Sequence, residues 1–150
     1  MKIIITGPGG AGKTTLKNIL ISKGASFGRM VTTRPKRFIG ENEYIFIESS
    51  SRDLASELNE TGLITAEYNG WIYGISMGAL ERNDLFILPP AIIDKLPKSI
   101  RDQSIIIYVN MSEAVRFSRL SKRTGDDPTR RIESDRADFA NFKNYDLMIN

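Results

Sequence analysis

The residues best suited to chemistry lie near the start of the chain, where glycines, a lysine and a threonine follow a short apolar run. Positions 7 to 14 read G-P-G-G-A-G-K-T, the G-x-x-x-x-G-K-T spacing of a phosphate-binding P-loop. Glycines let backbone N–H groups turn inward around an anion, and the N-terminus of a following helix adds partial positive charge. Lysine supplies a charge for the β- and γ-phosphates, and a threonine hydroxyl can ligate Mg²⁺. The predicted ATP-binding residues are Gly7, Gly9, Gly10, Ala11, Gly12, Lys13, Thr14 and Thr15, with Lys13 catalytic and Thr14 as metal ligand.

A P-loop must lie between a strand and a helix, and the flanking sequence predicts both. Lys2 to Thr6 is apolar and rich in β-branched residues, which is typical of a strand. Thr14 to Lys23 carries apolar residues at helical spacing, and Gly24 is a suitable C-terminal cap.

A second group of cations follows in the segment V-T-T-R-P-K-R, residues 31–37. Pro35 favours an extended backbone around Arg34, and arginine binds phosphate through two parallel hydrogen bonds. The segment is therefore either a second phosphate clamp or a solvated basic turn.

Hydrophobic periodicity predicts alternating strands and helices along the rest of the chain. Asn69-Gly70 is a strong hairpin signal, and it joins two short strands into a β-rich region between residues 31 and 74. Alternating strands and helices after a P-loop indicate an α/β fold with a parallel sheet flanked by helices and ligands at the carboxyl edge of the sheet. The expected strands cover 43–48, 63–68, 71–73, 85–88, 104–109 and 147–149, and the expected helices cover 53–61, 76–82, 91–96, 112–122 and 129–142.

The amino-acid composition limits the reactions that the protein could catalyse. The 150 residues include no His and no Cys, which excludes His-based acid–base catalysis, thiol catalysis and Cys- or His-ligated metals. Phosphoryl transfer suits the remaining residues, because it depends on positioning and charge stabilisation. The net charge of +3 is too small to indicate a nucleic-acid partner, and no apolar run is long enough to span a membrane. We therefore expect a cytoplasmic single domain, monomeric or homodimeric.

The segment 116–136 is strongly basic and is interrupted by Gly125-Asp126-Asp127-Pro128. Its sequence predicts two helices with a break between them. We expect Arg116, Lys122 and Arg136 to be solvated helix charges.

The sequence resembles the guanylate kinase family along nearly its whole length. The P-loop, the T-T-R-P-K-R segment with Gly40-Glu41, the Tyr44-Ile45-Phe46 strand and the turn ending in Tyr73-Gly74 resemble family motifs in the family's order. Arg119-Leu120 with Arg123 resembles the start of the family's lid, and residues 145–150 resemble its closing strand.

The resemblance implies a nucleoside monophosphate kinase that uses ATP and Mg²⁺. It implies a core over residues 1–30, 75–115 and 137–150, an acceptor-binding insertion over 31–74 and a short lid over 116–136. Arg119, Arg123 and Arg131 would then close over the transferring phosphoryl group, although the lid length leaves open whether Arg130 or Arg131 faces the site. The implied residues for the acceptor phosphate are Arg34, Arg37, Tyr44 and Tyr73.

Three departures from the family concern the base and the metal. The family reads guanine with a Glu before the hairpin, and the matching stretch here offers Thr65 or, with a shifted gap, Glu67. The family's hydroxyl residue after Tyr-Gly is replaced by Ile75, with Ser76 one position later. The strand 85–88 lacks acidic residues and ends in Pro89-Pro90.

Three interpretations therefore stay open. The first is an active kinase for GMP, dGMP or a related, modified nucleotide. The second is a guanylate-kinase-like nucleotide-binding protein with little turnover. The third is a different small-molecule P-loop kinase.

Overall fold

Two four-stranded sheets organise the computed structural model, which describes residues 1–48, 58, 62–123 and 127–150. The first sheet has the order β6-β1-β7-β8, and all its strand pairs are parallel. Its strands are β1 (Lys2–Thr6), β6 (Leu85–Ile87), β7 (Ser104–Val109) and β8 (Leu147–Ile149). This confirms the predicted α/β fold with a parallel sheet flanked by helices.

The central strands of the first sheet are covered on both faces. In β1, Ile4 belongs to one buried cluster with Phe86 and Ile106, while Ile5 belongs to another with Leu85. The second cluster is completed by residues of α1 (Lys13–Ser22), which packs against that face. Coverage on both faces explains why these strands are almost continuously apolar.

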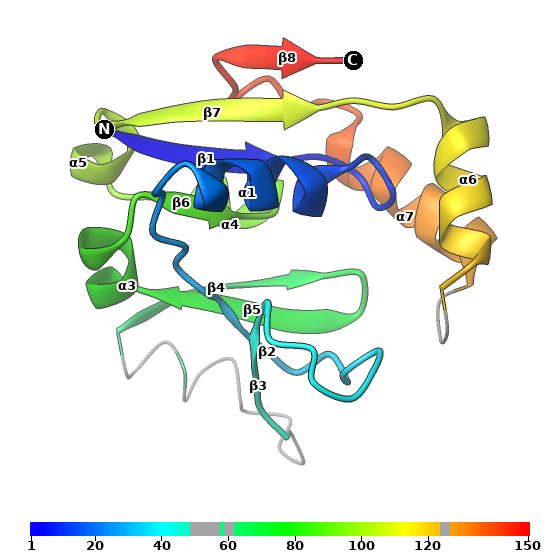
Figure 1. Ribbon diagram of the computed structural model, residues 1–150, viewed down its shortest axis with the longest axis horizontal. Coiled ribbons are helices and arrows are strands. Elements are labelled where there is room, and N and C mark those ends of the chain that lie inside the picture. The colour runs from blue at the N-terminus through cyan, green and yellow to red at the C-terminus, as the bar shows by residue number, and fades with distance from the viewer. Residues whose placement is uncertain (49–57, 59–61, 124–126) are drawn as a thin grey trace.

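The second sheet has the order β3-β2-β5-β4 and lies below the first in Figure 1. Its strands are β2 (Val31–Thr32), β3 (Ile45–Phe46), β4 (Leu63–Tyr68) and β5 (Trp71–Ser76). The predicted hairpin is confirmed: Asn69 and Gly70 both have positive φ, 53° and 84°, which a type I′ turn requires. The predicted strand 43–48 is shorter than expected, and it pairs parallel to β2.

Three short helices lie in the chain between β5 and β7. They are α3 (Met77–Arg82), α4 (Pro90–Ile93) and α5 (Lys98–Arg101), of which α5 was not predicted. Ser76 caps α3 by accepting a hydrogen bond from the Ala79 N–H, and Pro90 begins α4. The predicted helix 53–61 lies outside the described residues, apart from Leu58.

Two further helices lie at the end of the sheet to which β1 and β7 point (Figure 1). They are α6 (Glu113–Ser121) and α7 (Pro128–Phe139), and they pack against each other. Ser112 caps α6 by accepting a hydrogen bond from the Val115 N–H, and Asp127 caps α7 through hydrogen bonds from the Thr129 and Arg130 N–H groups. The P-loop and both helices therefore lie at the carboxyl edge of the parallel sheet. The division into core, acceptor-binding insertion and lid stays a prediction.

Candidate functional site

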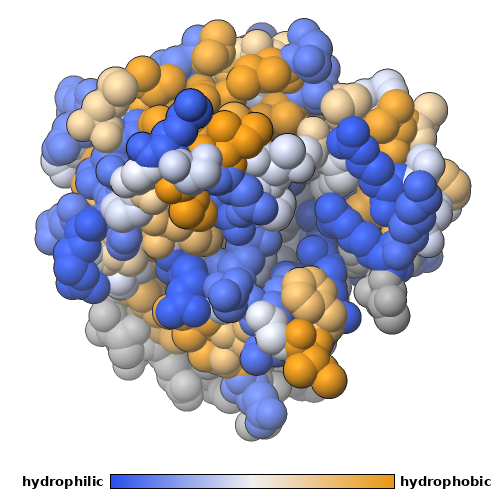
Figure 2. Space-filling view, in the orientation of Figure 1, coloured by the Kyte–Doolittle hydropathy of each residue, from blue (hydrophilic) through white to orange (hydrophobic). Residues whose placement is uncertain are grey.

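A cavity of about 580 Å³ opens between the P-loop, the second sheet and the two C-terminal helices. In Figure 2 the surface is hollowed at this place, and hydrophilic side chains border the hollow. Ile87, at the carboxyl end of β6, and Met111, two residues beyond β7, line it, so the cavity has the position expected for ligands of a parallel sheet. Six cationic side chains line it: Lys13, Arg34, Arg37, Arg119, Arg123 and Arg131.

The P-loop forms one wall through backbone conformations that favour glycine. Gly12 has φ +105° at the N-cap of α1, and Gly10 has φ +77°. A Cβ on Gly10 would also lie 3.2 Å from the Arg116 carbonyl oxygen, so the loop packs closely against α6. All eight residues predicted to bind ATP line the cavity. Among positions 7–15, Pro8 alone does not line it.

Lys13 is folded back onto its own loop. Its Nζ donates to the Gly7 carbonyl at 2.6 Å and to the Pro8 carbonyl at 2.9 Å. Burial, together with the nearby charges of Arg131 and Arg123, lowers the pKa of Lys13 from 10.5 to about 7, against the opposing effects of Asp135 and Glu43. The loop therefore holds a lysine whose charge is disfavoured until an anion arrives.

The predicted acceptor clamp is held by a buried ion pair. Arg34 Nη2 lies 2.6 Å from Glu41 Oε1, and both side chains are almost fully buried. Glu41 Oε2 also accepts a hydrogen bond of 2.7 Å from the Arg37 N–H. Burial acts to raise the pKa of Glu41, but the hydrogen bonds and charges of Arg34 and Arg37 lower it overall. Arg34 also lies over the Tyr44 ring, with its guanidinium carbon 5.1 Å from the centroid.

Three tyrosines line the cavity next to this clamp. Tyr44 and Tyr73 were predicted, and their rings meet edge to face at 5.7 Å. Tyr68, which the sequence reasoning missed, meets Tyr73 at 5.9 Å. Burial raises the pKa values of Tyr44 and Tyr68, so both hydroxyls stay protonated and can donate hydrogen bonds. The sequence contained the information needed to predict Tyr68. The Asn69-Gly70 turn places Tyr73 opposite Ala66, and Ala66 lies on the same face of β4 as Tyr68.

The same register places Thr65 and Glu67 away from the cavity, and their predicted role in binding the acceptor stays a prediction. Neither residue lines the cavity, because β4 residues of odd number point to the opposite face from Tyr68. Thr65 is buried and pairs with Gly74, while Glu67 is exposed and pairs with Ile72.

The predicted lid arginines approach the cavity from α6 and α7. Arg119 donates to the Gly10 carbonyl at 2.9 Å, and Arg123 lines the cavity beyond it. Of the two alternatives left open by the sequence, Arg131 lines the cavity and is buried. Arg130 is exposed and lies near the Trp71 ring instead, 5.9 Å from its centroid.

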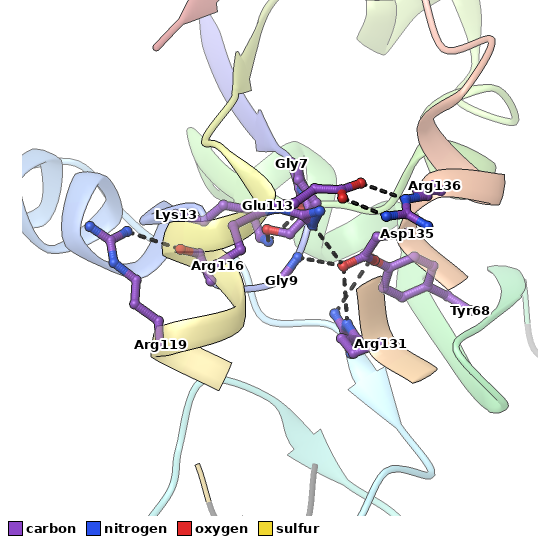
Figure 3. Close-up of polar contacts among 12 residues, drawn as sticks. Gly7, Gly9, Lys13, Tyr68, Glu113, Arg116, Arg119, Arg131, Asp135 and Arg136 are labelled. Carbon is purple, nitrogen blue, oxygen red and sulfur yellow. Dashed lines mark hydrogen bonds and ion pairs between the residues drawn. The ribbon is translucent and has the colours of Figure 1, made fainter. Parts of the chain in front are cut away.

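A buried carboxylate that the sequence reasoning missed joins the lid to the P-loop (Figure 3). Asp135 Oδ2 accepts a hydrogen bond of 2.9 Å from the Gly9 N–H, and Oδ1 accepts one of 2.6 Å from the Tyr68 hydroxyl. Arg131 Nε and Arg116 Nη1 each lie 3.4 Å from Oδ2. Asp135 therefore connects α7 to the P-loop, to β4 and to α6.

The prediction that Arg116 is a solvated charge is wrong. Its side chain is 4% exposed, because α6 turns it inward toward Asp135. Lys122 and Arg136 are exposed, as predicted, and Arg136 pairs with Glu113 on the outer surface of the two helices (Figure 3).

Among residues 1–48, 58, 62–123 and 127–150, no helix combines the length and apolarity needed to cross a bilayer. Within the same ranges, no three acidic side chains gather in a way that could hold a metal ion.

Comparisons with known proteins agree with this arrangement. The family model described as guanylate kinase matches residues 1–150. A crystal structure of guanylate kinase from Anaplasma phagocytophilum is similar, with a TM-score of 0.70, 20% identity, and coverage of 99% of this chain and 75% of that one. A structure of deoxyadenosine kinase from M. mycoides with bound dATP has a TM-score of 0.43 and 17% identity, covering 100% of this chain and 91% of that one. No curated protein sequence matches the chain.

Proposed function

Because the chain belongs to the guanylate kinase family, we propose that it transfers the γ-phosphoryl group of ATP to the phosphate of a nucleoside monophosphate. One observation carries the proposal: cations from the P-loop, the second sheet and the helices α6 and α7 all line one cavity. A single triphosphate needs only the P-loop cations, whereas two phosphorylated substrates need a second, separate clamp.

Each group of cations has its own task in this proposal. The P-loop N–H groups and Lys13 bind the donor phosphates, and Arg34 and Arg37, with the hydroxyls of Tyr44 and Tyr73, bind the acceptor phosphate. The third group, Arg119, Arg123 and Arg131, stabilises charge on the transferring group between the two substrates.

The chemistry needs no general base. The attacking oxygen belongs to a phosphate that is already ionised, so the protein must bring it into line with the γ-phosphorus and neutralise charge. A chain without His can do both with arginine and lysine side chains. Closing α6 and α7 over the P-loop would also exclude water, which would otherwise compete as acceptor.

Mg²⁺ fits the oxygen donors at the P-loop. The Thr14 hydroxyl lines the cavity at the start of α1, and it is a hard ligand of the kind that Mg²⁺ prefers. When bound, the ion would supply positive charge at the β- and γ-phosphates. Thr14 would hold it together with the phosphate oxygens.

The proposed acceptor is GMP, dGMP or a related, modified nucleotide, which rests on family membership. Within the described part of β4, Tyr68 lines the cavity and neither Thr65 nor Glu67 does. The base is therefore the part of the proposal that experiment must decide.

The test is an assay of purified protein with Mg·ATP and a panel of ribo- and deoxynucleoside monophosphates, scored for diphosphate product. We expect product with at least one member and none with the Lys13→Ala variant. Product with no member would overturn the kinase proposal and favour a nucleotide-binding protein with little turnover. Product with a pyrimidine alone would retain the kinase and reject the guanine assignment.

The Arg34→Ala variant separates the acceptor half of the site from the donor half. We expect it to raise the KM for the monophosphate far more than the KM for ATP, because Arg34 lies two residues beyond β2 of the second sheet and not in the P-loop. An effect confined to ATP would contradict this assignment.

A further inference from the structure

Glu43 occupies an unusual place in the cavity. It precedes β3 in the second sheet, yet its carboxylate reaches across to α1. Glu43 Oε1 lies 3.3 Å from the Thr14 hydroxyl oxygen and 3.3 Å from Lys17 Nζ. The side chain is 19% exposed and lines the cavity, so one carboxylate joins the second sheet to the first turn of the P-loop helix.

Glu43 is also the sole carboxylate among the described residues that line the cavity. The carboxyl end of β6, which faces the P-loop, contributes Ile87, Leu88 and Pro89. P-loop enzymes hold Mg²⁺ with the P-loop hydroxyl and an acidic residue. In this chain β6, the strand that pairs with β1, has apolar residues at the position where such an acid would lie.

We propose that Glu43 supplies the carboxylate for the Mg²⁺ that accompanies the donor nucleotide, acting beside the Thr14 hydroxyl; this inference rests on the proposed function. Mg²⁺ binds oxygens at about 2.1 Å in an octahedron, so two neighbouring ligand oxygens lie about 3.0 Å apart. The 3.3 Å between the two side-chain oxygens is close to that separation. Carboxylate and hydroxyl oxygens are both donors that Mg²⁺ prefers.

Lys17 offers a competing explanation for the position of Glu43. An ion pair at 3.3 Å, with the two side chains 11% and 19% exposed, is common between helices and neighbouring loops without any metal. The two explanations differ in what they predict for nucleotide binding. A metal ligand matters only when the metal is present, whereas an ion pair that positions α1 matters with and without it.

The experiment measures the affinity of the full chain for a non-hydrolysable ATP analogue, first with EDTA and then with Mg²⁺. The Glu43→Gln variant keeps the size of the side chain and removes its charge. We expect the gain in affinity given by Mg²⁺ to fall about tenfold in this variant, the lower range for loss of an oriented group at a metal site. We expect metal-free affinity to stay equal or rise, because a negative charge near the phosphates is removed.

A direct readout of the metal uses Mn²⁺ and electron paramagnetic resonance. The protein with bound ADP should bind Mn²⁺ about tenfold more weakly after the Glu43→Gln substitution. Glu48→Gln is the matched control: Glu48 lies two residues beyond β3, is exposed and does not line the cavity. It should leave both measurements unchanged. If Glu43→Gln lowers the melting temperature too far, Glu43→Asp, which keeps the charge on a shorter side chain, replaces it.

Two results would overturn the proposal. The first is an unchanged Mg²⁺ dependence in Glu43→Gln. The second is an equal loss of affinity with and without metal that Lys17→Gln reproduces, which would assign Glu43 to the ion pair alone. Neither measurement requires turnover, so failure to phosphorylate any monophosphate is a separate result that concerns the proposed function.

Discussion

Lys13 should take up a proton when a nucleotide binds. In the free protein, burial and the charges of Arg131 and Arg123 hold the pKa of Lys13 at about 7, and its amine donates to two loop carbonyls. A phosphate in the P-loop would place at least two negative charges beside this amine. An opposite charge at contact distance favours the protonated form, so the pKa should return toward its ordinary value of 10.5.

The size of the effect follows from these two pKa values. At pH 8 a group with a pKa of about 7 holds about 0.1 proton, and one with a pKa near 10.5 holds about 1.0, so binding takes up about 0.9 proton. At pH 6 the free protein already holds about 0.9 proton, and the uptake falls to about 0.1. Because the pKa of Lys13 rises on binding, the protein takes up protons when the anion binds. Its affinity for the anion therefore decreases as pH rises above 7.

Calorimetry of ADP binding in Hepes and in Tris measures this uptake, because the two buffers differ in ionisation enthalpy. The uptake can be assigned to Lys13, because the chain has no His or Cys and the exposed Met1 amine lies at the opposite end of β1 from the P-loop. Lys13→Arg is the matched control, because arginine stays charged and should remove the uptake at pH 8. A binding enthalpy at pH 8 that is independent of the buffer would refute the reasoning.

Three further variants test the rest of the site. Arg131→Ala should lower kcat about 100-fold or more in steady-state assays, as loss of a transition-state donor does. The control Arg130→Ala, at the adjacent position, should change kcat less than about threefold. Equal losses in the two variants would contradict the placement of Arg131. Glu41→Gln should lower the free energy of unfolding in urea by about 3 kcal/mol, because Arg34 keeps a buried charge without its carboxylate; the double variant with Arg34→Met should recover most of that loss. Asp135→Ala should speed amide exchange in α7 much more than in β1, and uniform exchange would argue against a local role for Asp135.

Local patterns made much of the fold predictable. The P-loop is a contiguous motif, so spacing alone placed Lys13 and Thr14 at the start of a helix, where the structure has them. Apolar runs such as Leu85 to Leu88 predicted buried parallel strands, because such strands are covered on both faces. The Asn69-Gly70 turn fixed the register of β4 and β5. That register also contained information that the sequence reasoning did not use, since it places Thr65 and Glu67 on the face of β4 opposite to Tyr68.

Long-range partners could not be predicted in the same way. Asp135 and Arg116 stand in helices rich in charged residues. The neighbours of Arg116 in the sequence are exposed on both sides, and Asp135 lies between the half-buried Ser134 and the exposed Arg136. Their burial depends on how α6 and α7 meet the P-loop, which is 126 residues away from Asp135 in the chain. The contact between Glu43 and Thr14 has the same character, because it joins two elements whose relative position no local pattern encodes.

The placement of the carboxylates explains how so many cations can share one cavity before a substrate arrives. Glu41 pairs with Arg34 and Asp135 pairs with Arg131, and neither carboxylate lines the cavity, while Glu43 is the one described acid on its surface. The two hidden carboxylates offset like-charge repulsion and fix the direction of Arg34 and Arg131, yet they leave the cavity wall itself positive. Incoming phosphates therefore meet oriented donors and a favourable potential. It follows that a neutral nucleoside, which offers no phosphate to either clamp, should bind far more weakly than its monophosphate.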